Sequence, residues 1–199
     1  DKTLDITETI FKALMTFKIP TYRAFPTGYD SVISMILEIG QLLGREGRAE
    51  EIVHDMEDSR DHVIDRVGGL DHGKRPAVLF VTYYDGSSDP WVGTSSTFSG
   101  DLIELAGGRN AIEHDAGIVI QVSLEDIIMN DPDIIITSQS STWPTTSRQT
   151  ILSEGAWSDI TAVKHGMVVD IDADLVDRTG PRLGRGLEEL HQRIHPLET

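Results

Sequence analysis

The first third of the chain carries apolar residues at helical spacing. This periodicity predicts helices over residues 6–18, 30–43 and 47–67. The third helix is heavily charged and has a single apolar stripe, so we expect it to lie mostly exposed along a larger body. Residues 19–25 are expected to be an extended strand, because Pro20 ends the first helix and the residues that follow can alternate between two faces.

From residue 76 onward, short apolar runs alternate with helical patterns. Buried strands are expected at residues 77–82, 134–136 and 167–171, with a short extended piece at residues 118–121. Helices are expected at residues 98–106, 147–152, 157–163 and 182–194. Strands that alternate with helices over this length predict an α/β fold with a doubly wound, mostly parallel sheet flanked by helices and preceded by a long helix.

The stretch of residues 121–137 combines a short helix with a central strand. Ser123 is expected to cap the helix, and Leu124, Ile127 and Ile128 to form its buried face. Asp131-Pro132 ends the helix, and the β-branched run at residues 134–136 predicts a strand covered on both faces. Glu125 and Asp126 are thereby held at a rigid helix start, as structural charges or as a docking point.

Composition narrows the function classes. The formal charge of −16 argues against nucleic-acid binding, which needs a concentrated basic surface. The absence of cysteine excludes disulfides, thiol catalysis and zinc sites built on cysteine. No run approaches the roughly 18 apolar residues of a membrane span, and the first residues lack the basic and apolar regions of a signal peptide.

Candidate chemistry gathers in the loops that follow the predicted strands, where binding sites of open α/β sheets form. These loops, at residues 83–97, 138–146 and 172–181, are rich in aromatic and small hydroxyl side chains. The candidate ligand-binding residues are Tyr84, Trp91, Trp143, Arg178 and Arg182. They predict an aromatic-lined cleft with a cationic group, or else aromatic caps on the core.

Two further patterns are compatible with binding but have simpler explanations. Gly93 to Thr97 precedes a helix and could cradle an anion, although it lacks the lysine of a P-loop, and capping by hydroxyls explains it as well. His191 and His195 have the spacing of a metal pair, or else belong to a frayed last turn. No nucleophile elbow of the Gly-x-Ser-x-Gly form is present, so we expect no enzymatic activity.

An ordered set of short motifs resembles one family. The motifs are LLGRE at residues 42–46 with AEE at 49–51, GTSSTFSG at 93–100 with Leu102 and Ile103, AGGRN at 106–110, QVSLED at 121–126, DPD at 131–133, AVK at 162–164 with Gly166, and R-x-GPR at 178–182. Together they resemble the substrate-binding proteins of ABC importers for iron-siderophores, haem and cobalamin.

The resemblance implies two α/β lobes that are joined by one long helix and hold the ligand between them. It assigns residues 1–27 to a remnant of the N-terminal lobe, 28–75 to the linking helix region and 76–199 to the C-terminal α/β lobe. The strand at residues 19–25 then lacks its sheet partners. We expect it to be disordered, repacked, or paired with another copy of the chain in a self-association.

The resemblance also implies a function. The protein would capture a metal chelate (an iron-siderophore, haem or cobalamin) and deliver it to a membrane permease, with no bond chemistry and no cofactor of its own. Glu125 matches the family's permease-docking glutamate, and its carboxylate would pair with arginines of the permease. The location would be extracytoplasmic, periplasmic or at the cell surface, with a membrane anchor in the full-length form. A stand-alone hydrolase- or transferase-type enzyme, or a sensor or structural module, is the alternative.

Overall fold

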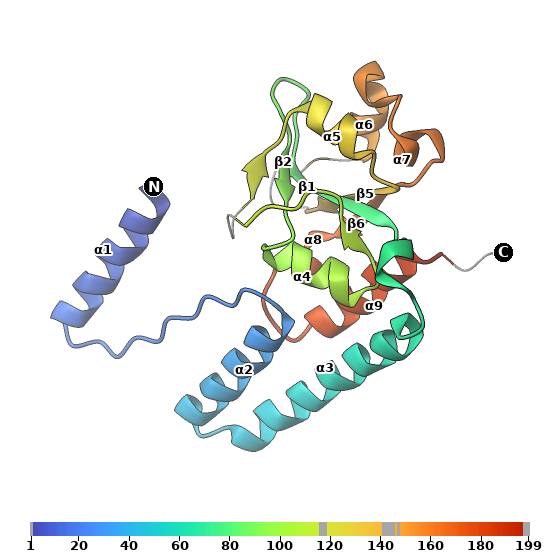
Figure 1. The fold of residues 1–199 in the computed structure, drawn as a ribbon. Coiled ribbons are helices and arrows are strands. Elements are labelled where there is room, and N and C mark those ends of the chain that lie inside the picture. The colour runs from blue at the N-terminus through green and yellow to red at the C-terminus, as the bar shows by residue number, and fades with distance from the viewer. Residues whose placement is uncertain (1, 116–118, 141–145, 147, 197–199) are drawn as a thin grey trace.

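A computed structural model describes residues 2–115, 119–140, 146 and 148–196, and the side chains from residue 8 onward within these ranges. Three helices come first: α1 (Lys2–Thr16), α2 (Tyr29–Leu43) and α3 (Glu46–Val67). Figure 1 shows α2 and α3 as an antiparallel pair beneath the α/β body, with α1 set apart from both. The predicted helices at residues 30–43 and 47–67 are confirmed to within one residue at each end.

The sheet is mixed but mostly parallel, as predicted. Its strands are β1 (Ala77–Tyr83), β2 (Trp91–Gly93), β3 (Arg109–Asn110), β4 (Ile120–Gln121), β5 (Ile134–Gln139) and β6 (Val168–Asp172). The order is β4-β2-β1-β5-β6, with β3 paired to β1 outside this path. β5 lies parallel to both β1 and β6, while β2 is antiparallel to its two neighbours, β1 and β4. Strand β2 lies inside the stretch of residues 83–97, which the sequence predicted to be a loop.

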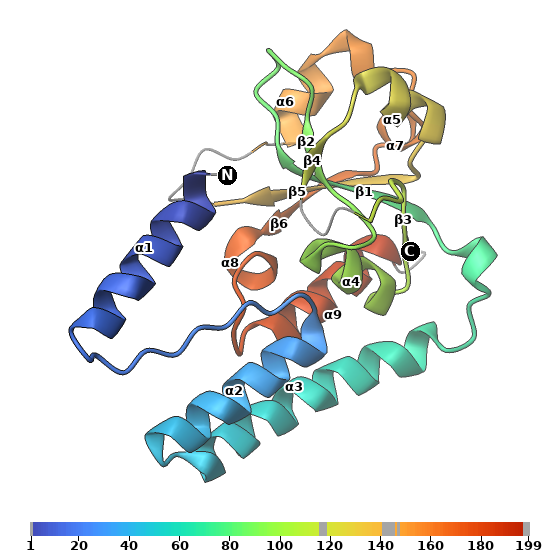
Figure 2. The same ribbon diagram turned by 60° about the vertical axis from the view of Figure 1, so that its left-hand side comes forward.

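Helices cover both faces of the sheet. On one face lie α4 (Phe98–Leu105), α8 (Ala173–Val176) and α9 (Leu183–Ile194), and on the other lie α5 (Leu124–Asn130), α6 (Arg148–Ser153) and α7 (Thr161–Lys164), as Figures 1 and 2 show. Short 3₁₀ turns occur at His72–Lys74 and Gly155–Trp157. Side chains of β1 alternate between the two cores: Val78 and Phe80 belong to one, and Leu79 and Val81 to the other. The doubly wound arrangement is therefore confirmed.

The α2–α3 pair joins the first of these cores. The buried stripe of α3 includes Val53, Met56 and Val63, and the helix packs along α9. Tyr29 at the start of α2 is 1% exposed, and its hydroxyl donates a hydrogen bond to the Met56 carbonyl at 2.7 Å. Gly44 ends α2 in the left-handed conformation (φ 61°), which a glycine adopts without strain. The single predicted stripe is thus enough to hold α3 on the body.

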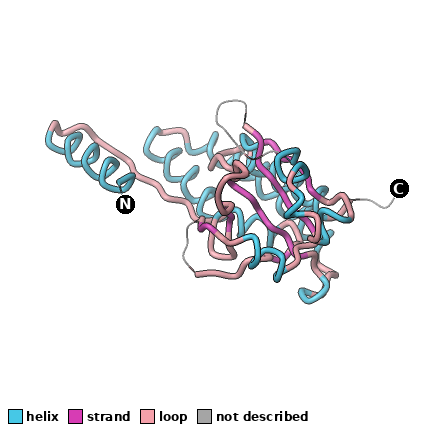
Figure 3. Tube along the Cα trace, turned by 90° about the horizontal axis from the view of Figure 1, so that it is seen from above, coloured by secondary structure: helices cyan, strands magenta, loops and turns pink. Residues whose placement is uncertain are grey.

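The N-terminal segment differs from its prediction. Residues 19–25 form no strand; they run as a mostly exposed connection, because they pair with no described strand of the sheet. Arg23 instead holds this connection to α1 through an ion pair with Glu8 at 3.1 Å, and its guanidinium lies over the Phe25 ring. Figure 3 shows α1 and this connection projecting from the rest of the molecule.

Two local predictions were also wrong. Ile128 was expected in the core but is 39% exposed, because the short helix α5 turns only Ile127 fully inward. The segment after β6, expected to be a loop, contains the turn of helix α8, which Asp172 caps by accepting a hydrogen bond from the Asp174 N–H at 2.9 Å.

Candidate ligand-binding site at the carboxyl edge of the sheet

Strands β1, β5 and β6 run in the same direction, so their last residues meet at one edge of the sheet. In open α/β sheets, ligands bind in the crevice outside this edge. β2 starts at the same edge, because Trp91 pairs with Tyr83 at the end of β1. Both aromatic side chains are more than a third exposed, at 38% for Tyr83 and 37% for Trp91.

A hollow of about 270 Å³ opens beside this edge, on the face of the sheet that carries α4. Its lining is apolar at Phe80, Phe98 and Val119, carries hydroxyls at Thr82, Thr97 and Ser99, and ends at the carboxylate of Asp177. This volume lies just below the range of roughly 300–1,000 Å³ that is usual for ligand pockets. It suits part of a binding site, with one apolar wall and a few converging polar groups.

The start of α4 supplies the hydroxyl side of the hollow. Thr97 caps the helix, since its Oγ1 accepts a hydrogen bond from the Gly100 N–H at 3.3 Å and donates one to the Thr94 carbonyl at 2.7 Å. Ser99 lies next to it, with 3.0 Å between the two hydroxyl oxygens. A Cβ at Gly100 would lie 2.2 Å from the Thr94 carbonyl oxygen, so only glycine fits there. Capping therefore accounts for the hydroxyl-rich run after Gly93.

Asp177 supplies the charge of the hollow. It directly follows α8, and its side chain is exposed. Burial by the surrounding protein raises the pKa of its carboxyl group, against the opposing effects of a hydrogen bond from Ser138 and the charge of Arg178. The Asp177 carboxylate makes no ion pair with any residue in the described ranges. No sequence pattern distinguished it, because it is one of many acidic residues in this chain.

The two arginines proposed from the sequence lie together, but not in this hollow. Arg178 pairs with Asp174 one helical turn earlier, and the Arg182 guanidinium lies 3.8 Å from the same carboxylate. Both side chains are more than half exposed. Arg182 precedes α9, and its side chain does not cap that helix.

The aromatic candidates separate. Tyr84 is 8% exposed and packs into the opposite core, with its ring centroid 5.3 Å from that of Trp157 and its hydroxyl 3.0 Å from Glu154. Trp91 remains at the carboxyl edge of the sheet. Trp143 lies outside the described residues.

Glu125 occupies a different surface, in the first turn of α5. Ser123 caps this helix by accepting a hydrogen bond from the Asp126 N–H at 3.1 Å, as predicted, and donates one to the Asp126 carboxylate at 2.7 Å. Asp126 is thus engaged in the helix start. Glu125 is exposed, and within the described ranges its side chain forms no hydrogen bond or ion pair. Of the two predicted acidic groups, Glu125 has the free carboxylate.

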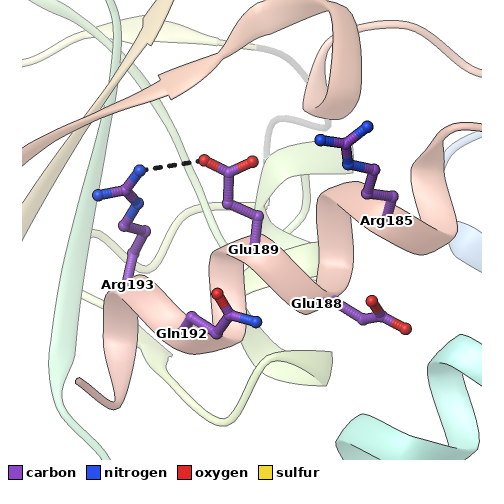
Figure 4. A pocket seen from close by; sticks show the side chains of 5 residues that line it. All are labelled: Arg185, Glu188, Glu189, Gln192 and Arg193. Atoms are coloured by element: carbon purple, nitrogen blue, oxygen red, sulfur yellow. Dashed lines mark hydrogen bonds and ion pairs between the residues drawn. The ribbon is translucent and has the colours of Figure 1, made fainter. Parts of the chain in front are cut away.

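Two other clusters have structural explanations. Figure 4 shows a hollow over the polar face of α9, where Arg193 and Glu189 pair at 3.1 Å on one exposed helix face. The rings of His191 and His195 each lie against a backbone carbonyl, of Ala106 at 3.0 Å and of Gly107 at 3.1 Å. These contacts tie the end of α9 to the end of α4. Burial lowers the pKa of His195, a direction that the carbonyl of Gly107 opposes.

Among the residues with described positions, no group of three or more histidine, aspartate or glutamate side chains could hold a metal ion. No described helix is long and apolar enough to cross a bilayer. The candidate ligand-binding site is the hollow at the sheet edge, with Trp91 and Tyr83 beside it.

Comparison with known proteins finds a matching protein family and similar proteins of known class. The model of the periplasmic binding protein family matches residues 7–175. The chain is 30% identical over 170 residues to an ABC transporter substrate-binding lipoprotein, YvrC of Bacillus subtilis, covering 84% of this chain and 51% of that protein. It is 27% identical over 172 residues to the cobalamin-binding protein of Halobacterium salinarum, covering 85% of this chain and 45% of that protein. The chain spans about half the length of these curated relatives.

Solved structures share the fold. The periplasmic heme-binding protein RhuT from Roseiflexus has a TM-score of 0.78 at 23% identity, covering 93% of this chain and 70% of that chain. IsdE of Staphylococcus aureus, complexed with heme, also has a TM-score of 0.78, at 18% identity, covering 96% of this chain and 74% of that chain.

Proposed function

The chain belongs to the periplasmic binding protein family, and from this premise we propose that it acts as the solute-binding component of an ABC importer. It captures a metal chelate, an iron-siderophore, haem or cobalamin, and delivers it to a membrane permease. The observation that carries the proposal is the family match over residues 7–175, together with the open hollow at the carboxyl edge of the sheet. The cobalamin-binding relative supports a chelate as cargo.

The proposed organisation follows the sequence-based division. Residues 1–27 belong to an N-terminal lobe, residues 28–75 link the lobes, and residues 76–199 form the C-terminal lobe. The exposed apolar side chains of the first part support this division, since Phe17 is 76% exposed and Phe25 is 63% exposed. Such side chains ordinarily pack against a further surface.

Binding rather than catalysis fits the chemistry of the hollow. Hydroxyls line it beside a single carboxylate, and no histidine, lysine or cysteine lies among its lining residues to activate a nucleophile. The alternative of a hydrolase or transferase would need such a pair within hydrogen-bonding reach. The protein therefore holds its cargo through apolar contacts and hydrogen bonds and releases it unchanged.

Glu125 is the proposed contact with the permease. Its carboxylate is exposed, and the capped first turn of α5 fixes its position. A guanidinium group on the permease would form a charge-assisted, bidentate contact with it. The site of action is extracytoplasmic, periplasmic or at the cell surface, with membrane anchoring in the full-length form. The YvrC relative is a lipoprotein, which agrees with such anchoring.

Self-association through residues 19–25 is the second proposed contact. Ile19, Tyr22 and Phe25 are exposed at 48%, 42% and 63%, so a second copy could cover them. Sedimentation of the chain over a range of concentrations measures this. A double variant, Ile19→Ser with Phe25→Ser, should shift the distribution toward the monomer, and a wild-type chain that stays monomeric throughout would refute the contact.

Titration of the chain with haem, cobalamin and ferric siderophores tests the cargo. Binding should change the absorbance of the chelate and quench the fluorescence of Trp91, whose position beside the hollow makes it a reporter. The variant Trp91→Phe should lose part of the quenching but keep the absorbance change. An absence of any response, together with turnover of ester or phosphate substrates, would favour the enzyme alternative.

Pull-down on proteoliposomes that contain the permease of the same import system tests the docking. Glu125→Gln should lower retention about tenfold or more, because it removes one charge of an ion pair. Glu50→Gln, on the exposed side of α3, removes the same charge and should leave retention unchanged. Equal retention of both variants would refute the role of Glu125.

A further inference from the structure

The described lining of the hollow at the sheet edge carries one negative charge and is otherwise neutral. Among the described residues that line it, Asp177 is charged and none is a lysine, arginine or histidine. The remaining lining is apolar or carries hydroxyls, which are neutral donors and acceptors. A bound molecule therefore meets an apolar wall and one negative charge.

The neighbouring carboxylates at this edge have more polar partners than Asp177 has. Asp174 is shared by Arg178 and Arg182. Asp170 accepts a hydrogen bond from the Arg148 N–H at 2.8 Å and also binds the Thr137 hydroxyl. Asp177 has a hydrogen bond from Ser138 and no ion pair within the described ranges.

The two nearby arginines, Arg178 and Arg182, do not cancel the negative charge of the hollow. Both guanidinium groups that follow α8 lie at Asp174, and neither belongs to the lining of the hollow. An anionic chelate would have to displace an ion pair to reach a positive charge. A cationic or uncharged chelate with N–H groups would find Asp177 as a ready acceptor.

We propose that the binding site of this chain selects cationic or uncharged chelates over anionic ones, with Asp177 as the residue that sets the preference. The inference rests on the proposed function, because it assigns the charge class of the cargo of that same site. The carboxylate attracts cationic cargo and hydrogen-bonds N–H donors, and it repels carboxylate-bearing cargo by like charge.

Competition among chelates of different charge tests the proposal on the whole chain. The cationic probe is ferrioxamine B, a trihydroxamate complex. The uncharged probe is cyanocobalamin, and the anionic probes are ferric citrate and hemin. The wild-type chain should bind a cationic or uncharged probe at least about tenfold more tightly than either anion. Added salt should weaken the binding of the cationic probe and leave that of cyanocobalamin nearly unchanged.

Two substitutions at Asp177 and one matched control complete the experiment. Asp177→Asn should weaken the cationic probe about tenfold and narrow the gap to the anions, whereas Asp177→Glu should keep the preference. Asp89→Asn removes the same charge from an exposed side chain in the loop before β2, outside the hollow, and should change every affinity by less than about twofold. Far-ultraviolet circular dichroism confirms that each variant is folded.

The outcomes separate the two proposals. Preferential binding of ferric citrate or hemin, or equal effects of Asp177→Asn and Asp89→Asn, would overturn the charge preference and leave the function as a binding protein in place. Failure of the folded wild-type chain to bind any of the probes would overturn the proposed function and the charge preference with it.

Discussion

Replacing Gly100 by alanine should destabilise the protein, although Gly100 lies in a helix where alanine is normally preferred. The added Cβ would lie 2.2 Å from the Thr94 carbonyl oxygen and 2.9 Å from that of Ser95, and both are backbone atoms. The Thr94 carbonyl cannot retreat freely, because it accepts hydrogen bonds from the Thr97 hydroxyl at 2.7 Å and from the Thr97 N–H at 3.0 Å. The turn must therefore move by about 1 Å and weaken the cap of α4.

The expected net loss follows from three contributions. Overpacking costs about 1–3 kcal/mol, and weakening of the cap adds about 1 kcal/mol. The gain in helix propensity returns roughly 1 kcal/mol. We expect the free energy of unfolding to fall by roughly 1–3 kcal/mol, which for a chain of this size lowers the Tm by roughly 2–12 °C.

Urea unfolding followed by tryptophan fluorescence measures this change, because Trp157 is fully buried and reports loss of the core. Gly47→Ala is the matched control: its Cβ would meet nothing within 4 Å in the first turn of α3, so it should be neutral or stabilise by up to about 1 kcal/mol. The same stability for Gly100→Ala as for the wild type would refute the close approach of the Thr94 carbonyl. The variant should also weaken chelate binding, because Thr97 and Ser99 line the hollow.

Three further predictions concern α5 and the turn that follows it. Ser123→Ala should lower the free energy of unfolding by about 1 kcal/mol in urea, since it removes the helix cap; no loss would contradict that role. Ile127→Ala should cost about 2–5 kcal/mol, whereas Ile128→Ser should stay within about 0.5 kcal/mol; equal losses would mean that both side chains are buried. Hydrogen bonds from the Thr161 N–H and hydroxyl lower the pKa of Asp131, so its contribution is present above the unfolded-state pKa, near 4, and is lost as the pH falls through the lower folded-state value. Urea midpoints at several pH values should therefore show Asp131→Asn less stable at pH 7, with the difference shrinking in acid; a constant difference would contradict the linkage.

Local patterns determined most of the elements. The run Ile134 to Ile136 predicted a doubly covered strand, and all three side chains are at most 2% exposed. Ser123 predicted the start of α5, and Gly44 predicted the end of α2. These features depend on periodicity and on caps within a few residues, which a sequence displays directly.

The sites depended on contacts between distant segments. Arg178 was a candidate because of its type and loop, and only the fold shows that its charge is engaged by Asp174. Tyr84 was a candidate for the same reason, and only the fold turns its ring toward Trp157. Asp177 had no signal in the sequence, because its position depends on how α8 packs against β5, β6 and α9.

The chain by itself thus determined which segments are helices and strands and where they are capped. The tertiary structure decided which side chain of each loop faces the hollow, which carboxylates are paired, and that residues 19–25 form no strand. The reason is physical: helix and strand periodicity arises from neighbours in sequence, whereas burial and ion pairing arise from groups brought together across many tens of residues.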